Sequence, residues 1–179
     1  MSWLFRGVKM ELPGSNYLLT LATISITFVG LSTIAFVFRQ ALGTRLPAPE
    51  IQLIRSFIRT GFGITIFSLL PLLLGLLSIT PSLVWRVSSF VLALAHINGL
   101  IWIFRGTQAL RSVFAASWQL YITLGISIAV ILGLFINTIG IVIEPNVGLY
   151  ALGATWILVE EMLTFILALR LFLEPLKKE

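Results

Sequence analysis

Two adjacent glutamates, Glu160 and Glu161, interrupt the apolar run at residues 152–170, and the single histidine, His96, lies inside another apolar run. An ionisable side chain in the hydrocarbon layer costs roughly 2.5 to 3.5 kcal/mol by insertion scales, so such groups face a partner or a water-filled cavity. Burial and a neighbouring like charge both favour the neutral carboxyl group, which makes the pair a candidate proton or cation site. The structural alternative is a neutral glutamic acid that hydrogen-bonds His96, a threonine hydroxyl or a second copy of the chain. The sequence leaves both interpretations open.

Helical geometry groups these polar residues. Counted at ~1.5 Å per residue, His96 and Glu160 lie about 20 Å and 18 Å from the starts of their predicted helices, so they share a depth. His96 lies on a small-residue face with Ser89, Ala93 and Gly99, whereas Asn98 points nearly the opposite way and serves a different neighbour. The predicted ion, proton or polar core consists of four residues: Glu160, Glu161, His96 and Asn98.

The sequence offers few other residues for metal binding or catalysis. The chain has no cysteine and no aspartate, which excludes thiolate zinc sites, iron–sulfur clusters and catalytic cysteines. One histidine cannot form a histidine-pair metal motif, and no nucleophile motif marks any serine, so we predict no metal, no cofactor and no enzymatic activity. Haem or pigment ligation by His96 is the alternative, because its small-residue face could admit a macrocycle.

The composition indicates a membrane protein. Of the 179 residues, 58% are hydrophobic and 11% are charged, far from the ~25% charged residues of soluble domains. Five segments reach the length of about 20 residues that crosses a bilayer. We therefore predict an all-α bundle of five transmembrane helices in a single domain over 1–179, with an interfacial segment at 1–16 and helices at approximately 17–38, 56–79, 83–104, 118–141 and 148–172.

The distribution of basic residues predicts the orientation of the chain in the membrane. With the N-terminus outside and the C-terminus inside, nine basic residues lie on the inner side and three on the outer side, as the positive-inside rule requires. The net charge of +5 is spread over loops and helix ends, so no nucleic-acid partner is predicted. Most inner arginines suit headgroup contacts, and three could form an inner vestibule or docking site: Arg55, Arg59 and Arg105.

Small residues recur at helical spacing on two predicted helices. Such stripes let membrane helices approach closely, within the chain or between copies. The predicted helix-packing positions are Thr23, Thr27, Gly30, Gly125, Ala129 and Gly133.

Several runs in the first half of the chain carry a resemblance: "ATISITFVGLSTIAFVFRQ", "IRTGFGITIFSLLPLLL" and "WRVSSFVLALA". They resemble a loose group of small, uncharacterised bacterial multipass membrane proteins. The resemblance implies a location in the bacterial inner membrane and brings no activity with it.

Two functions follow as hypotheses. The first is a small oligomeric ion or proton channel or transporter-like protein, with the glutamates as the conducting or gating site. Its partners would be the lipid bilayer and further copies of the chain. The alternative is a non-catalytic accessory or sensor subunit of a larger membrane complex.

Overall fold

The computed structural model describes residues 12–77, with a gap at 42–47, and residues 79–106 and 117–173. Within these ranges the chain is helical and forms no strand. All five described helices are long and apolar enough to cross a membrane, in agreement with the predicted multipass class. They are α1 (Ser15–Ala41), α2 (Ala48–Leu76), α3 (Pro81–Gly106), α5 (Ser117–Ile139) and α6 (Val147–Leu173).

The helix boundaries differ most from the prediction at α2, which begins at Ala48 instead of residue 56. The prediction followed the apolar run, but a helix can extend beyond it as a polar turn, and Pro49 is tolerated in a first turn. The end of α5 is set by Gly140, whose φ of 67° is the left-handed conformation that closes many helices. Of the predicted interfacial segment, residues 1–11 lie outside the described residues.

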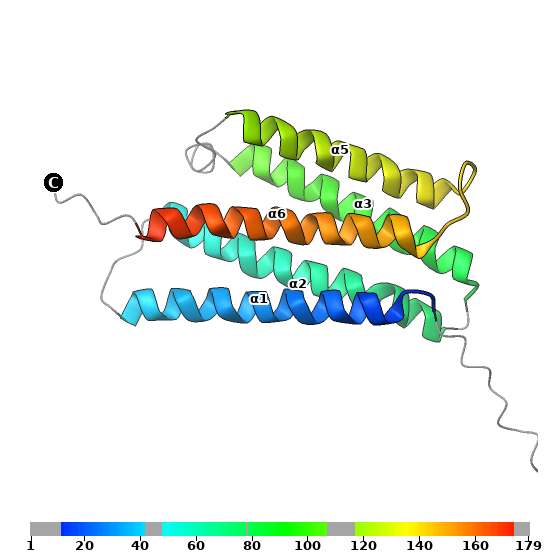
Figure 1. Cartoon of the computed structure of the whole chain (residues 1–179), viewed down its shortest axis with the longest axis horizontal. Helices are drawn as coiled ribbons and strands as arrows, with labels where there is room; N and C mark the ends of the chain where they lie inside the picture. The colour runs from blue at the N-terminus through cyan, green and yellow to red at the C-terminus, as the bar shows by residue number, and fades with distance from the viewer. Residues whose placement is uncertain (1–11, 42–47, 78, 107–116, 174–179) are drawn as a thin grey trace, which may run out of the picture.

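The helices form two hairpins with α6 between them (Figure 1). One hairpin consists of α1 and α2, the other of α3 and α5, and α6 packs against both. We call the end of the bundle at which α1, α3 and α6 begin the N-terminal end, and the opposite end the C-terminal end. A side chain on α6 can therefore reach either hairpin, depending on its direction around the helix.

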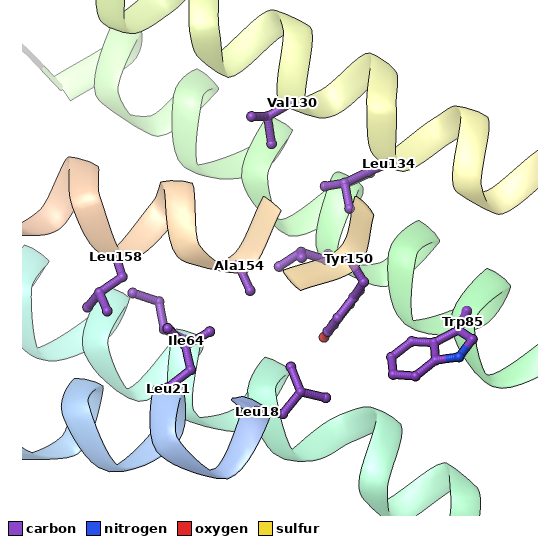
Figure 2. Close-up of a cluster of buried hydrophobic side chains, with 11 residues drawn as sticks. Leu18, Leu21, Ile64, Trp85, Val130, Leu134, Tyr150, Ala154 and Leu158 are labelled. Carbon is purple, nitrogen blue, oxygen red and sulfur yellow. The ribbon is translucent and has the colours of Figure 1, made fainter. Parts of the chain in front are cut away.

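One apolar cluster fills the space where the hairpins and α6 meet (Figure 2). Leu158 and Ala154 of α6 lie in it with Ile64 of α2 and Leu21 of α1, while Leu92 contributes from α3. Each is at most 5% exposed, and Leu134 of α5 completes the cluster, so contact between side chains of all five described helices holds the two hairpins to α6.

The closest approach of α1 and α2 occurs at Gly61. Ser25 of α1 donates a hydrogen bond of 2.8 Å to the Gly61 carbonyl oxygen, and a Cβ atom at position 61 would lie 2.1 Å from Cγ2 of Val29. Only glycine permits this contact without movement of its neighbour. The packing face of α1 therefore includes Ser25 and Val29.

The predicted packing face of α1 is wrong for contacts within the chain. Thr23, Thr27 and Gly30 are exposed, and a Cβ atom at Gly30 would meet no other atom within 4 Å. Each threonine hydroxyl donates to the carbonyl oxygen one turn earlier on α1, so it is satisfied without another helix.

The predicted stripe on α5 is also turned away from the bundle over most of its length. Gly125 and Ala129 are exposed, while Gly133 is half-buried and approaches Leu149. The glycine that packs closely between α5 and α6 is Gly153, whose added Cβ atom would lie 3.0 Å from Leu134. Spacing alone did not distinguish a stripe that packs inside the chain from one on its surface.

Helix α2 continues through Pro71, and α6 compensates for the proline. Proline has no N–H, so the carbonyl oxygen of Phe67, one turn earlier, loses its helical donor. The hydroxyl group of Tyr150, a fully buried residue on α6, donates a hydrogen bond to that oxygen. This contact joins α6 to the proline turn of α2.

Candidate functional site

The site is centred on Glu160, which lies 13 residues into α6 and therefore about 20 Å from the N-terminal end of the bundle. Its Oε1 atom accepts hydrogen bonds from the Ser127 hydroxyl of α5 and from Nε1 of Trp156, the latter at 2.8 Å. Trp156 Nε1 also lies 3.1 Å from the Ser127 oxygen, so the three side chains form one network. Two donors thus fix one carboxyl oxygen, while the side chain remains 20% exposed.

The second carboxyl oxygen faces α3. Oε2 of Glu160 lies 3.9 Å from Nε2 of His96, whose side chain is 4% exposed. This distance is too long for a direct hydrogen bond, and Nε2 has no hydrogen-bond partner among the described residues. The sequence prediction that His96 and Glu160 share a depth is confirmed, and their side chains are neighbours.

Glu161 lies in a different environment from Glu160. It is 6% exposed and lies beside the Thr60 side chain of α2. Its Oε1 atom has no hydrogen-bond partner among the described residues. Successive residues on a helix point about 100° apart, which is why the two glutamates meet different hairpins.

Asn98 does not belong to the polar core, so this part of the prediction is wrong. The residue is exposed on the surface of α3, whereas His96, two positions earlier, is buried. Residues two apart on a helix point in nearly opposite directions, and only one of them can face the bundle.

Sequence reasoning missed Ser127, Trp156 and Thr60. Trp156 precedes Glu160 by four residues, a spacing at which side chains on a helix meet. The sequence spacing could therefore have predicted this contact. No sequence spacing could have predicted the contacts of Ser127 and Thr60, because these residues lie on other helices. Only the packing of α5 and α2 against α6 brings them to the glutamates.

A second polar network closes the N-terminal end of the bundle around Asn137, which is fully buried on α5. Its amide nitrogen donates to Ser89 of α3 at 2.7 Å and to the carbonyl oxygen of Asn146 at 3.0 Å. Its amide oxygen accepts from the backbone N–H of Asn146 at 2.9 Å. All these groups are paired, so the network ties α3 and α5 to the start of α6.

Two of the three predicted vestibule arginines can be placed. Arg55 and Arg59 are exposed on α2, and the guanidinium carbon of Arg59 lies 5.8 Å from the ring centroid of Trp102 on α3. This cation–π contact links the two hairpins toward the C-terminal end. The side chain of Arg105 lies outside the described residues.

The surroundings of His96 bear on the haem or pigment alternative. Nε2 faces Glu160, and Ser89 and Ala93 on the same side of α3 are fully buried by the chain's own helices. The part of the small-residue face formed by Ser89 and Ala93 is therefore filled by packing, whereas Gly99, further along α3, is half-buried and meets no other atom within 4 Å of an added Cβ atom. Within the described part of the chain, no group of three or more histidine, cysteine, aspartate or glutamate residues could hold a metal ion.

Comparison with protein-family models, curated proteins and solved structures gives no match for this chain. The function is therefore inferred from the geometry of the site.

Proposed function

We propose that the chain is a small, non-catalytic multipass membrane protein that conducts or transports protons, with Glu160 and His96 as its protonatable groups. The observation that carries the proposal is the 3.9 Å between Oε2 of Glu160 and Nε2 of His96, halfway along helices suited to crossing a bilayer. Ionisable groups at this depth are costly, and in membrane proteins they mark ion pathways and proton relays.

A proton fits this site better than a larger cation. Oε1 of Glu160 already accepts from Ser127 and Trp156, which leaves Oε2 and the histidine nitrogen to bind the transported species. A metal or alkali ion needs several oxygen or nitrogen ligands, whereas a proton needs one acceptor at a time. A carboxyl group and an imidazole separated by little more than hydrogen-bonding distance can exchange a proton directly or through one water molecule.

The test is proton flux into liposomes that contain the full-length protein and an internal pH-sensitive dye. Glu160→Gln keeps the acceptor for Ser127 and Trp156 but cannot ionise, so we expect flux to fall by roughly a hundred-fold, the lower range for loss of a proton-transferring group. Glu161→Gln is the matched control because it removes the neighbouring carboxyl group, which faces Thr60 and lies outside the His96 pair. We expect it to keep most of the flux; full flux in Glu160→Gln would remove the proposed site.

A second candidate, an accessory or sensor subunit of a larger membrane complex, is favoured by the exposed small residues. Thr23 and Thr27 on α1, and Gly125 and Ala129 on α5, lie on the outer surface of the bundle. Such faces pack closely against other membrane helices, either from further copies of the chain or from another protein. Purification from native membranes distinguishes these cases: a stoichiometric foreign partner favours the accessory subunit, and a homo-oligomer alone favours the proton carrier.

We further propose a location in the bacterial inner membrane, with the N-terminal end of the bundle outside. The excess of basic residues toward the C-terminal end supports this orientation. Since the chain has no cysteine, a single Glu144→Cys variant can report it. Glu144 is exposed between α5 and α6, so a membrane-impermeant thiol reagent should label it in intact spheroplasts and not in sealed inverted vesicles.

A further inference from the structure

Two serine hydroxyl groups inside the bundle lack the partner that such groups normally have. Ser68 of α2 and Ser88 of α3 are both 0% exposed, and neither Oγ atom has a hydrogen-bond partner among the described residues. Other hydroxyl groups in the bundle, such as those of Ser32 on α1 and Thr65 on α2, donate to a carbonyl oxygen one turn earlier. A buried polar group without a hydrogen-bond partner destabilises the folded chain, so a fully buried hydroxyl is normally bonded to protein or to water.

The two serines share a depth on neighbouring helices. Ser68 lies eight residues before the end of α2 and Ser88 seven residues after the start of α3, so both are about 11 Å from the N-terminal end. A backbone carbonyl group next to Ser68 also lies outside the regular helical hydrogen-bond pattern. Pro71 has no N–H to donate to the carbonyl oxygen of Phe67, and this oxygen accepts from Tyr150 instead. Several hydrogen-bonding groups therefore occur at a similar depth of the bundle.

An apolar layer separates these serines from the glutamates. Ile64 is one turn from Ser68 along α2, and Leu92 is one turn from Ser88 along α3; they are 2% and 0% exposed and belong to the same buried cluster. Figure 2 shows Ile64 beside Leu21 and Leu158. One further turn along α3 reaches His96, whose Nε2 atom also lacks a partner among the described residues.

We propose that Ser68 and Ser88 form an internal water-binding site. This site is the part of the proton path between the N-terminal end and the His96–Glu160 pair, and Ile64 and Leu92 form the apolar barrier between the site and that pair. Bound water would satisfy both hydroxyl groups, and a water molecule that bridges polar groups is nearly as favourable as a direct hydrogen bond. Apolar constrictions of this kind block conduction by excluding water until they widen. The path rests on the proposed proton function, whereas the water site does not.

The water site is tested by thiol labelling of the full-length protein in nanodiscs. Because the native chain has no cysteine, Ser68→Cys and Ser88→Cys each place one thiol at the site with little change in volume. A small methanethiosulfonate reagent reacts with the thiolate, which forms only where water reaches the sulfur atom. Leu92→Cys is the matched control inside the apolar layer, and Glu144→Cys is the fully accessible reference.

We expect Ser68→Cys and Ser88→Cys to react at least about ten-fold faster than Leu92→Cys, because the thiolate requires hydration. Reaction of both variants at the rate of Leu92→Cys would overturn the water site.

The path is tested by flux in the liposome assay. Ser68→Ala and Ser88→Ala should lower flux several-fold, and Leu92→Ala should raise it by thinning the barrier. Unchanged flux in both serine variants, beside a loss in Glu160→Gln, would overturn the path and leave the proposed function standing. Absence of flux in the native protein would instead overturn the proposed function, and labelling would still decide the water site.

Discussion

The two sides of α6 use polar groups in different ways. Toward the α3–α5 hairpin, Glu160 shares a network with Ser127 and Trp156 and approaches His96, and it remains partly exposed. Toward the α1–α2 hairpin, Glu161 lies beside Thr60 and is almost completely buried. Two identical neighbouring residues therefore have different environments because a helix turns about 100° between them. The proposed proton transfer therefore lies on the first side, and a more completely buried carboxyl group on the second.

The α1–α2 side should be the more sensitive to a change in side-chain volume. Gly61→Ala places a methyl group where Cγ2 of Val29 lies, so we expect the free energy of unfolding to fall by about 1–3 kcal/mol. Gly125→Ala on α5 is the control, because an added Cβ atom there meets nothing within 4 Å. Thermal and SDS-induced unfolding in micelles measure both variants. Equal stability of the two would mean that α1 and α2 are not as closely packed as Gly61 indicates.

The contact between α6 and the proline turn should give the next largest effect. Tyr150→Phe leaves the buried Phe67 carbonyl oxygen without a donor, and we expect a loss of about 1–2 kcal/mol in the free energy of unfolding. Adding Pro71→Ala restores a backbone N–H to α2, so the double variant should recover much of this loss. Tyr121→Phe, at a residue 70% exposed on α5, is the control. A loss that is the same with and without Pro71 would show that the hydroxyl group stabilises the bundle by something other than this hydrogen bond.

On the Glu160 side, loss of one donor should cost less because the network contains others. Trp156→Phe removes the bond of 2.8 Å to Oε1, while Ser127 still donates to the same oxygen, so we expect a loss of about 0.5–1 kcal/mol. Trp118→Phe, at an exposed position on α5, is the matched substitution and should have no measurable effect. A loss of stability as large as that of Tyr150→Phe would show that this side also holds the bundle together.

Asn98 should give the smallest effect and sharpen the contrast with His96. Asn98→Ala changes an exposed residue on α3, so we expect its unfolding free energy to stay within about 0.5 kcal/mol of the native value. Its proton flux should equal that of the native protein within experimental error. His96→Gln, two positions away, should reduce flux strongly because it removes the imidazole that faces Glu160. Strong loss of flux in Asn98→Ala would place a conducting surface outside the bundle.

The sequence predicted the helices well because hydrophobic length is a local property. The number, type and order of the five long helices follow from apolar runs, and the common depth of His96 and Glu160 follows from the rise per residue. Boundaries were less predictable where a polar turn extends the helix, as at the start of α2. The buried face of each helix was least predictable, because apolar residues cover all sides of these helices and do not indicate which side is buried.

By itself, the sequence determined that two carboxyl groups and one imidazole lie in the middle of long apolar helices, because composition and spacing are properties of the chain. Only the tertiary structure decided that Glu160 faces Ser127 and His96, that Glu161 faces Thr60, and that the Thr23 and Gly125 stripes lie outside the bundle. The physical reason is that a helix presents residues in every direction, while the packing of two hairpins against α6 selects which directions become interior.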